Sequence, residues 1–272
     1  MKKLLITLTV LFFSFLLRAQ TFLDARDNAL EAIQNQNFSL AEKEIQRAIF
    51  FSPDSCKVDN LLIASDIFAA SGKGDDAIFF LNSAYSQTLD GVKKEEIVLK
   101  KADLLIFEKK FQDAKICALQ TSCNDDSLLV KKKYLRLAIC EFCLENYIDS
   151  ENYFKKITSE QKHEELNKIF FKTKRLKNPK NKLASVLSII PGLGQYYSSN
   201  FWQGIDSEII LGAFSGLFVI MQARYGTLSA FLAVFPWFQR YYVGGIKNAG
   251  RCAQLRREIK KNKMLNKALK NI

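Results

Sequence analysis

The sequence predicts an all-α fold, in which a solenoid of about four helical hairpins precedes a membrane module of two or three helices. Two observations predict it: pairs of small residues recur with a period near 36 in the first half, and three apolar stretches follow in the last third. The expected boundaries are 1–19 for a signal peptide, 20–158 for the repeats, 159–182 for a basic amphipathic linker helix, 183–246 for the membrane module and 247–272 for a basic tail.

The repeats are marked by small residues that stand twelve positions apart. The second members of successive pairs are 36, 37 and 36 residues apart, and an aromatic residue precedes three of them by three positions. Two antiparallel helices approach closely only where the side chains at their crossing are small. The pairs are Ala29 with Ala41, Ser65 with Ala77, Ala102 with Ala114, and Ala138 with Ser150.

These segments resemble the tetratricopeptide repeat over residues 21–158. Pro53 stands twelve residues after Ala41, and Ala48 and Ala84 stand seven after their partners, as in that family. Gly74 replaces the aromatic residue in the second repeat, and the third and fourth repeats lack the proline and the later alanine. Another solenoid of helical hairpins is the alternative. The resemblance implies a curved stack that binds peptides or proteins on its concave face and has no chemistry of its own.

The same resemblance places the first helix of each pair along the concave groove. It assigns four acidic residues to this surface: Asp59, Asp66, Glu96 and Asp103. It also assigns four apolar neighbours: Leu62, Leu99, Ile106 and Phe142. A protein or peptide that carries basic residues between apolar ones would match such a groove. The alternative is that the acids are only a solvated helix face.

The first nineteen residues have the pattern of a secretory signal. Lys2 and Lys3 precede an apolar run from Leu4 to Leu17, and Ala19 provides a small residue before a cut at Gln20. Retention of the segment as an anchor is the alternative. Because the first cysteine is Cys56, no cysteine at the cut can carry a lipid, and a lipoprotein is not expected.

The formal net charge of +12 is concentrated in one region. Residues 172–272 carry 17 basic and 3 acidic residues, whereas residues 20–171 carry 20 and 25. The basic residues bracket the apolar stretches, as in the flanks of membrane segments, so a nucleic-acid partner is not expected.

Three apolar stretches are candidates for membrane contact: Leu183–Tyr197, Ile205–Met221 and Thr227–Val243. Gly212 and Gly216 lie on one face of the second stretch, which predicts a close helix contact there. Before them, residues 159–182 have apolar residues at helical spacing, consistent with a cap on the solenoid or with a helix on the membrane surface.

The start of this region resembles a small membrane domain of bacterial envelope proteins, over residues 182–250. The motif residues are Pro191, Gly192, Gly194, Gln195, Tyr197, Trp202 and Gly204. Ser198-Ser199-Asn200 stands where family members usually have a glycine. The resemblance implies insertion into membrane lipid and no known reaction.

The expected topology follows from the signal and the nine basic residues between Lys247 and Lys270. A signal exports the repeats to the periplasm, and a basic tail is retained in the cytoplasm. Three crossings of the inner membrane satisfy both conditions. Two crossings, with a re-entrant first stretch, are the alternative.

The leading hypothesis is a membrane-anchored scaffold or adaptor of the bacterial envelope, and the alternative is an accessory component of a transport or insertion machine. With His163 as the only histidine and no recognisable nucleophile, base and acid, an enzyme is not expected, nor is a metal or cofactor. Cys140 and Cys143 lie in an apolar helical run and are expected to be buried thiols, with a disulfide as the alternative.

Overall fold

The computed structural model describes residues 21–122 and 127–272, and the signal segment lies outside this part. The described residues form thirteen α-helices, two 3₁₀ helices and no strand, which confirms the all-α class. The chain divides into two compact units, Met1–Tyr153 and Phe154–Ile272. The helices of the first unit are α2 (Phe22–Gln34), α3 (Phe38–Phe51), α4 (Asp54–Ala70), α5 (Gly74–Gln87), α6 (Gly91–Phe107), α7 (Phe111–Gln120), α8 (Ser127–Cys143) and the start of α9 (Tyr147–Ile157).

Four tight turns of one kind join α2 to α3, α4 to α5, α6 to α7 and α8 to α9. A residue with positive φ stands at the same place in each: Gln36, Gly72, Lys109 and Glu145, with φ of 56°, 80°, 62° and 69°. In each turn, the amide of the following residue donates to the carbonyl five residues before it. These are the bonds of the Schellman motif, which ends a helix in a left-handed residue.

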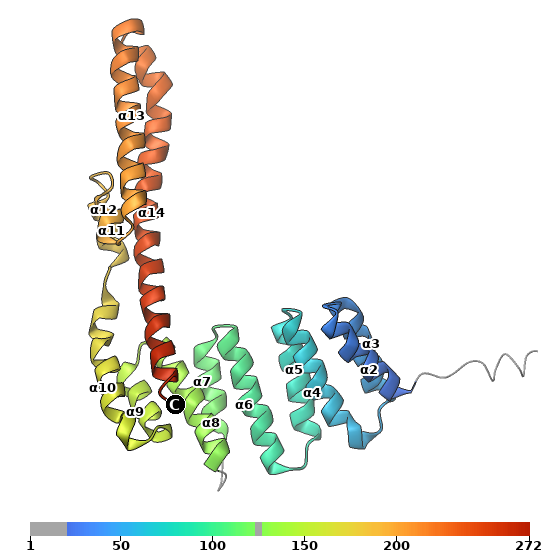
Figure 1. Ribbon diagram of the computed structural model, residues 1–272. Helices are drawn as coiled ribbons and strands as arrows, with labels where there is room; N and C mark the ends of the chain where they lie inside the picture. Colours follow the sequence, from blue (N-terminus) through green and yellow to red (C-terminus); the bar gives the residue numbers. More distant parts are fainter. Residues whose placement is uncertain (1–20, 123–126) are drawn as a thin grey trace, which may run out of the picture. The chain divides into compact units, whose positions relative to one another are not determined.

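The eight small residues that define the repeat are all fully buried. The two helices of each pair lie antiparallel, and α3, α5 and α7 also contact the next helix in the chain (Figure 1). Where serine replaces alanine at Ser150, its hydroxyl donates to the carbonyl of Ala138 at 2.8 Å. The two residues of this twelve-residue pair therefore touch.

The second unit begins with short helices rather than the one linker helix expected over 159–182. The 3₁₀ helix η1 (Glu160–Lys162), α10 (His163–Phe171) and the 3₁₀ helix η2 (Lys172–Lys177) follow one another. Leu166 and Phe170 of α10 are buried, and the Phe170 ring lies 5.9 Å from that of Phe154. Because this apolar face is covered by protein, it is not a lipid-binding face.

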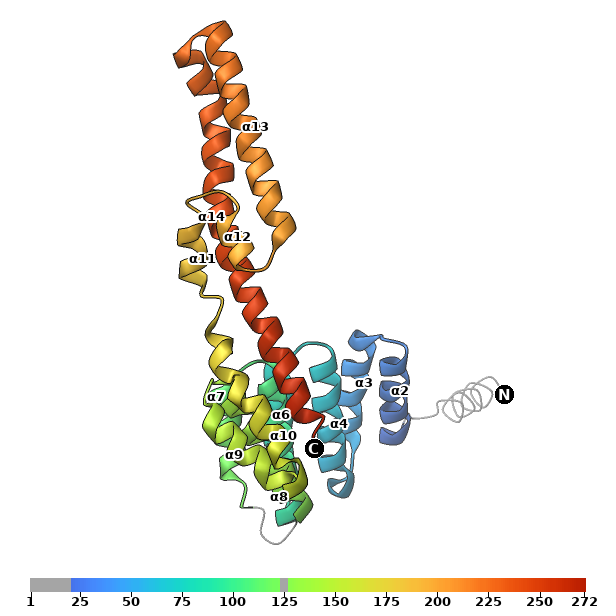
Figure 2. The same cartoon turned by 60° about the vertical axis from the view of Figure 1, so that its left-hand side comes forward.

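A helical hairpin of α13 (Phe201–Tyr225) and α14 (Thr227–Leu269) dominates the second unit (Figure 2). Gly226, with φ 83° and ψ 163°, forms the turn, in a conformation open essentially to glycine alone. Helix α13 is long and apolar enough to cross a membrane, and only 11% of its most apolar window is buried. Large apolar side chains are exposed on both helices, among them Ile209, Val219, Ile220, Leu228, Leu232 and Trp237.

The first apolar stretch does not form a membrane-spanning helix, so the prediction of three crossings is wrong. It folds into α11 (Asn181–Leu187) and α12 (Leu193–Tyr197), which both pack on α14. At about 1.5 Å per residue, helices of 7 and 5 residues are about 10 and 8 Å long, far short of the roughly 30 Å of a hydrocarbon core.

Two further expectations differ from the structure. Residues 247–269 continue α14 without a break instead of forming a separate tail. Gly212 and Gly216 are exposed, and a Cβ added at either would meet nothing within 4 Å. The close contact between α13 and α14 therefore does not run along these glycines.

Candidate functional site

The four acidic residues expected to line the groove are exposed, and each is paired with a base on the next first helix. On α4, the carboxylates of Asp59 and Asp66 accept hydrogen bonds from lysine ammonium groups on α6 at 2.7 and 2.8 Å. On α6, Glu96 and Asp103 pair with α8 residues at 3.9 and 2.5 Å. We call these pairs the ion-pair ladder: Asp59 with Lys93, Asp66 with Lys100, Glu96 with Lys132, and Asp103 with Arg136.

The ladder changes the electrostatics expected of this surface. Each carboxylate has a cation beside it, so the surface is not the acidic strip that the acids alone indicated. Exposed ion pairs of this kind contribute about 0–1 kcal/mol each to stability. Arg136 is the most constrained base, because its side chain is 14% exposed and also donates to the carbonyls of Leu99 and Lys132.

The apolar positions assigned to the groove are mostly core residues. Leu99 and Phe142 are 1% and 0% exposed, so neither can contact a ligand. Leu62 and Ile106 are partly buried against the hydrophobic core. The groove positions inferred from the repeat family therefore include the exposed acids correctly, but they also include Leu99 and Phe142, which belong to the core.

Four cysteines of the described residues are free thiols: Cys56, Cys117, Cys140 and Cys252. Burial raises the pKa of the Cys140 thiol to about 12, so it stays protonated near neutral pH. No cluster of histidine, cysteine and carboxylate residues within 21–122 and 127–272 could hold a metal ion.

The glycines of the membrane motif allow close packing in the second unit. Gly192 has φ 83°, and a Cβ there would lie 2.9 Å from the carbonyl oxygen of Gly204 on α13. A Cβ on Gly194 would collide with the carbonyl of Ala184 and approach the Cβ of Ala249 on α14 to 2.9 Å. The motif thus brings α12 against both α11 and the hairpin.

Hydrogen bonds hold α12 to α14. The side chain of Gln195, 1% exposed, donates to the carbonyl of Gly245 at 3.0 Å and accepts from the hydroxyl of Ser188 at 3.3 Å. The Ser198 hydroxyl donates to the Gly194 carbonyl of the same segment at 2.8 Å and also lies 3.4 Å from the Ala249 carbonyl on α14. The remaining motif residues are peripheral: Pro191 and Tyr197 are partly buried, the Tyr197 hydroxyl accepts from the Lys180 amide at 3.3 Å, and Trp202 is exposed.

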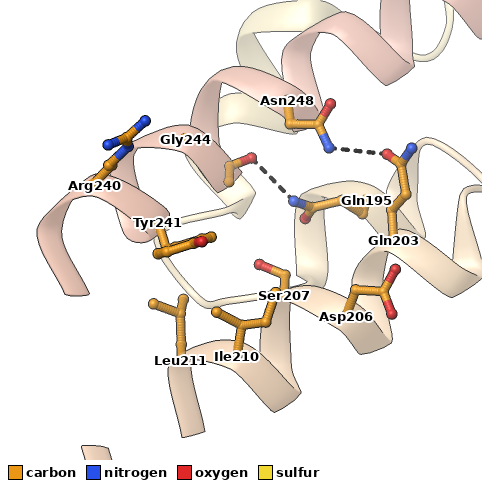
Figure 3. A pocket seen from close by; sticks show the side chains of 11 residues that line it. Gln195, Gln203, Asp206, Ser207, Ile210, Leu211, Arg240, Tyr241, Gly244 and Asn248 are labelled. Atoms are coloured by element: carbon orange, nitrogen blue, oxygen red, sulfur yellow. Dashed lines mark hydrogen bonds between the residues drawn. The ribbon is translucent and has the colours of Figure 1, made fainter. Parts of the chain in front are cut away.

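Beside this contact lies an open cavity of about 470 Å³ between the two helices of the hairpin, which we call the hairpin pocket (Figure 3). Its size is within the range of small-molecule sites. Two amides line one part, where Asn248 donates to Gln203 at 3.0 Å, and Ile210, Leu211 and Tyr241 line another. The full lining is Gln195, Gln203, Asp206, Ser207, Ile210 and Leu211 from α12 and α13, with Arg240, Tyr241, Gly244, Gly245 and Asn248 from α14.

The pocket carries one charge of each sign. Asp206 lies on α13 and Arg240 on α14, at opposite sides of the pocket in Figure 3. Neither has an ion-pair partner among the described residues. The sequence signal for this site is weak, because Gln203 on α13 is far in the chain from Arg240 and Asn248 on α14, and only the hairpin brings the two helices together.

The ladder and the hairpin pocket are thus the two candidate sites of the described chain, one in each compact unit. Comparison of the chain with protein-family models, with curated proteins and with solved structures finds no match in any of the three.

Proposed function

We propose that this protein is a membrane-anchored scaffold of the bacterial cell envelope, in which a tetratricopeptide-type solenoid binds a protein partner. The observation that carries the proposal is the recurrence of one turn, with its left-handed residue, at Gln36, Gly72, Lys109 and Glu145. Their spacing of 36, 37 and 36 residues equals that of the buried small residues. When successive helix pairs have the same turn and the same packing, they stack into a solenoid. The long surface of such a stack is suited to protein binding.

The hairpin of α13 and α14 is the proposed anchor. Its two helices bury small or apolar residues such as Leu211, Ala230 and Val234 against each other and expose larger ones outward. An apolar exterior on a helix of 25 residues matches lipid rather than water. Together with the signal pattern of residues 1–19, the hairpin supports a solenoid that lies in the periplasm and is anchored in the inner membrane.

The ion-pair ladder restricts how a partner could use the proposed groove. A peptide with basic residues would have to compete with Lys93, Lys100, Lys132 and Arg136 for the same carboxylates. Capture with an Asp66→Lys, Asp103→Lys variant tests this. Reduced recovery of a partner, with altered salt dependence, supports recognition of basic residues, whereas equal recovery rejects it.

The experiment that tests the scaffold proposal is affinity capture from gently solubilised membranes of cells that make the full chain. A matched variant lacks residues 21–153 and keeps the second unit. We expect both forms to fractionate with membranes and only the full chain to retain partners. Recovery of the full chain in the soluble fraction contradicts the anchor, and equal partners for both forms contradict the role of the repeats.

A further inference from the structure

The hairpin pocket lies where the uncharged parts of both hairpin helices end. Residues 209–223 of α13 and 227–239 of α14 contain no charged residue. Asp206 and Glu208 stand just before the first of these stretches, and Arg240 stands directly after the second. In a membrane-inserted hairpin, this is the level at which acyl chains give way to lipid headgroups.

The charged groups of the pocket are available to a ligand, while its amides are partly used. Gln195 and Gln203 already hydrogen bond to Gly245 and Asn248. By contrast, Asp206 and Arg240 are exposed, face the same cavity and have no ion-pair partner within the described residues. Because Asp206 and Arg240 line the same cavity without forming an ion pair with each other, they match a ligand that carries both a positive and a negative group.

We propose that the hairpin pocket binds the headgroup of a glycerophospholipid with a primary ammonium, as in phosphatidylethanolamine. This inference rests on the proposed insertion of the hairpin into a membrane. The Arg240 guanidinium would bind the phosphate, for which its planar fork of donors is suited. The Asp206 carboxylate would accept hydrogen bonds from the ammonium, and the acyl chains would continue along the exposed side chain of Ile210.

The lining favours this headgroup over two others. A quaternary ammonium, as in phosphatidylcholine, has no N–H to donate to Asp206 and is usually bound by several aromatic rings. Tyr241 is the single aromatic residue among those that line the pocket. A phosphatidylglycerol headgroup offers no cation, so Asp206 would face a net negative ligand without compensation.

The test uses the full-length protein, purified in detergent and stripped of lipid. Flotation with phosphatidylethanolamine–phosphatidylglycerol vesicles first checks insertion. Native mass spectrometry then measures retention of dioctanoyl phosphatidylethanolamine, phosphatidylcholine and phosphatidylglycerol from an equimolar mixture. We expect the ethanolamine lipid to be retained about tenfold more strongly than the others, as one additional charge-assisted hydrogen bond would give. An equimolar amount of free phosphoethanolamine should not displace it.

Two variants assign the two charges. Arg240→Gln should weaken retention of all three lipids about tenfold, because all carry the phosphate. Asp206→Asn should remove the preference for ethanolamine by weakening retention of that lipid. Phosphatidylcholine should be unchanged and phosphatidylglycerol should not be weakened, because the variant no longer places a negative charge beside its headgroup. Arg224→Gln is the matched control, since Arg224 lies on the same hairpin outside the pocket lining, and it should bind as the wild type does.

The results separate this inference from the anchor itself. Failure of the protein to float contradicts the proposed insertion. A protein that floats but retains the three lipids equally, or whose Arg240→Gln variant behaves like Arg224→Gln, overturns the pocket assignment alone. Displacement by free phosphoethanolamine would identify a soluble headgroup compound as the ligand and overturn the lipid assignment.

Discussion

Glu141 on α8 is a carboxylate with almost no access to solvent, since its side chain is 3% exposed. It accepts from the Lys115 ammonium on α7 at 2.6 Å and from the Asn146 amide at 2.7 Å. A buried ion needs such partners, because burial removes its hydration. This pair ties α7 to α8, so it joins one helix pair to the next.

We predict that Lys115→Met destabilises a fragment of residues 20–171 by about 1–3 kcal/mol, because the buried carboxylate loses its cation. Urea unfolding at pH 7 measures the change. The hydrogen bond from Lys115 to Glu141 raises the lysine pKa, so the contribution of the pair is complete below the ordinary lysine pKa and declines only as pH rises through the raised value. The loss should therefore be constant between pH 7 and 9.

The double variant Lys115→Met, Glu141→Gln is the control for this prediction. It replaces the buried charge by a neutral amide and should recover part of the lost stability. Equal stability of the wild type and Lys115→Met would show that the pair does not stabilise the fold.

Cys140 gives a second prediction at the level of one residue. Its thiolate is disfavoured by burial, which raises its pKa to about 12. At pH 8, we expect Cys140 to resist N-ethylmaleimide in the folded protein while the more exposed Cys56 reacts, as peptide mass mapping would show. In urea both should react. Rapid labelling of folded Cys140 would contradict its burial.

At the residue scale, some features could be predicted from the sequence and others could not. The burial of Ala29 and of Ser65 could be predicted, because each repeat places its small side chains where the two helices of a pair cross. The basic partners in the ion-pair ladder are harder to predict from the sequence, because each lysine or arginine pairs with an acid 33 to 36 residues away. Residues with this separation meet only because the first helices of successive pairs lie side by side.

Among the elements, the crossing of α6 and α7 tests the repeat register directly. Ala102 and Ala114 are fully buried in one core cluster. Ala102→Leu adds three carbon atoms to a full space and should destabilise the 20–171 fragment by about 1–3 kcal/mol. Thermal unfolding should show a melting temperature several degrees lower. Ala70→Leu, at the exposed end of α4, is the matched control, and an equal effect of both would contradict the register.

The hairpin shows why a local motif misled the prediction of helix packing. The inward side of α13 follows a spacing of three and four residues, through Gly204, Ser207, Leu211, Phe214, Phe218 and Met221. Gly212 and Gly216 are out of phase with this series. The turn at Gly226 and the packing of α12 on α14 fix which face of α13 packs against α14. Neither constraint can be inferred from the spacing of Gly212 and Gly216.

For the whole molecule, the number of crossings decides which segments share a side of the membrane. In the proposed anchor, both helices of the hairpin cross the membrane, so the basic residues before α13 and those in the second half of α14 would lie on the same side. Six basic residues lie between Lys172 and Lys182 and nine between Lys247 and Lys270. The rule that positive charge stays in the cytoplasm then conflicts with export by the signal. Because the first apolar segment usually dominates orientation, we expect export to prevail.

Cysteine labelling of intact cells with permeable outer envelopes tests this topology. Single cysteines replace Ser71 in a repeat turn, Lys267 near the end of α14, and Thr227 at the hairpin tip, and peptide mass mapping separates them from native cysteines. With an impermeant maleimide, we expect Ser71→Cys and Lys267→Cys to react and Thr227→Cys to be protected until the inner membrane is opened. Protection of Lys267→Cys alongside reactive Ser71→Cys would require an odd number of crossings and contradict the hairpin. Protection of both, with reactive Thr227→Cys, would keep the hairpin but reverse its orientation and show that the basic flanks outweigh the signal.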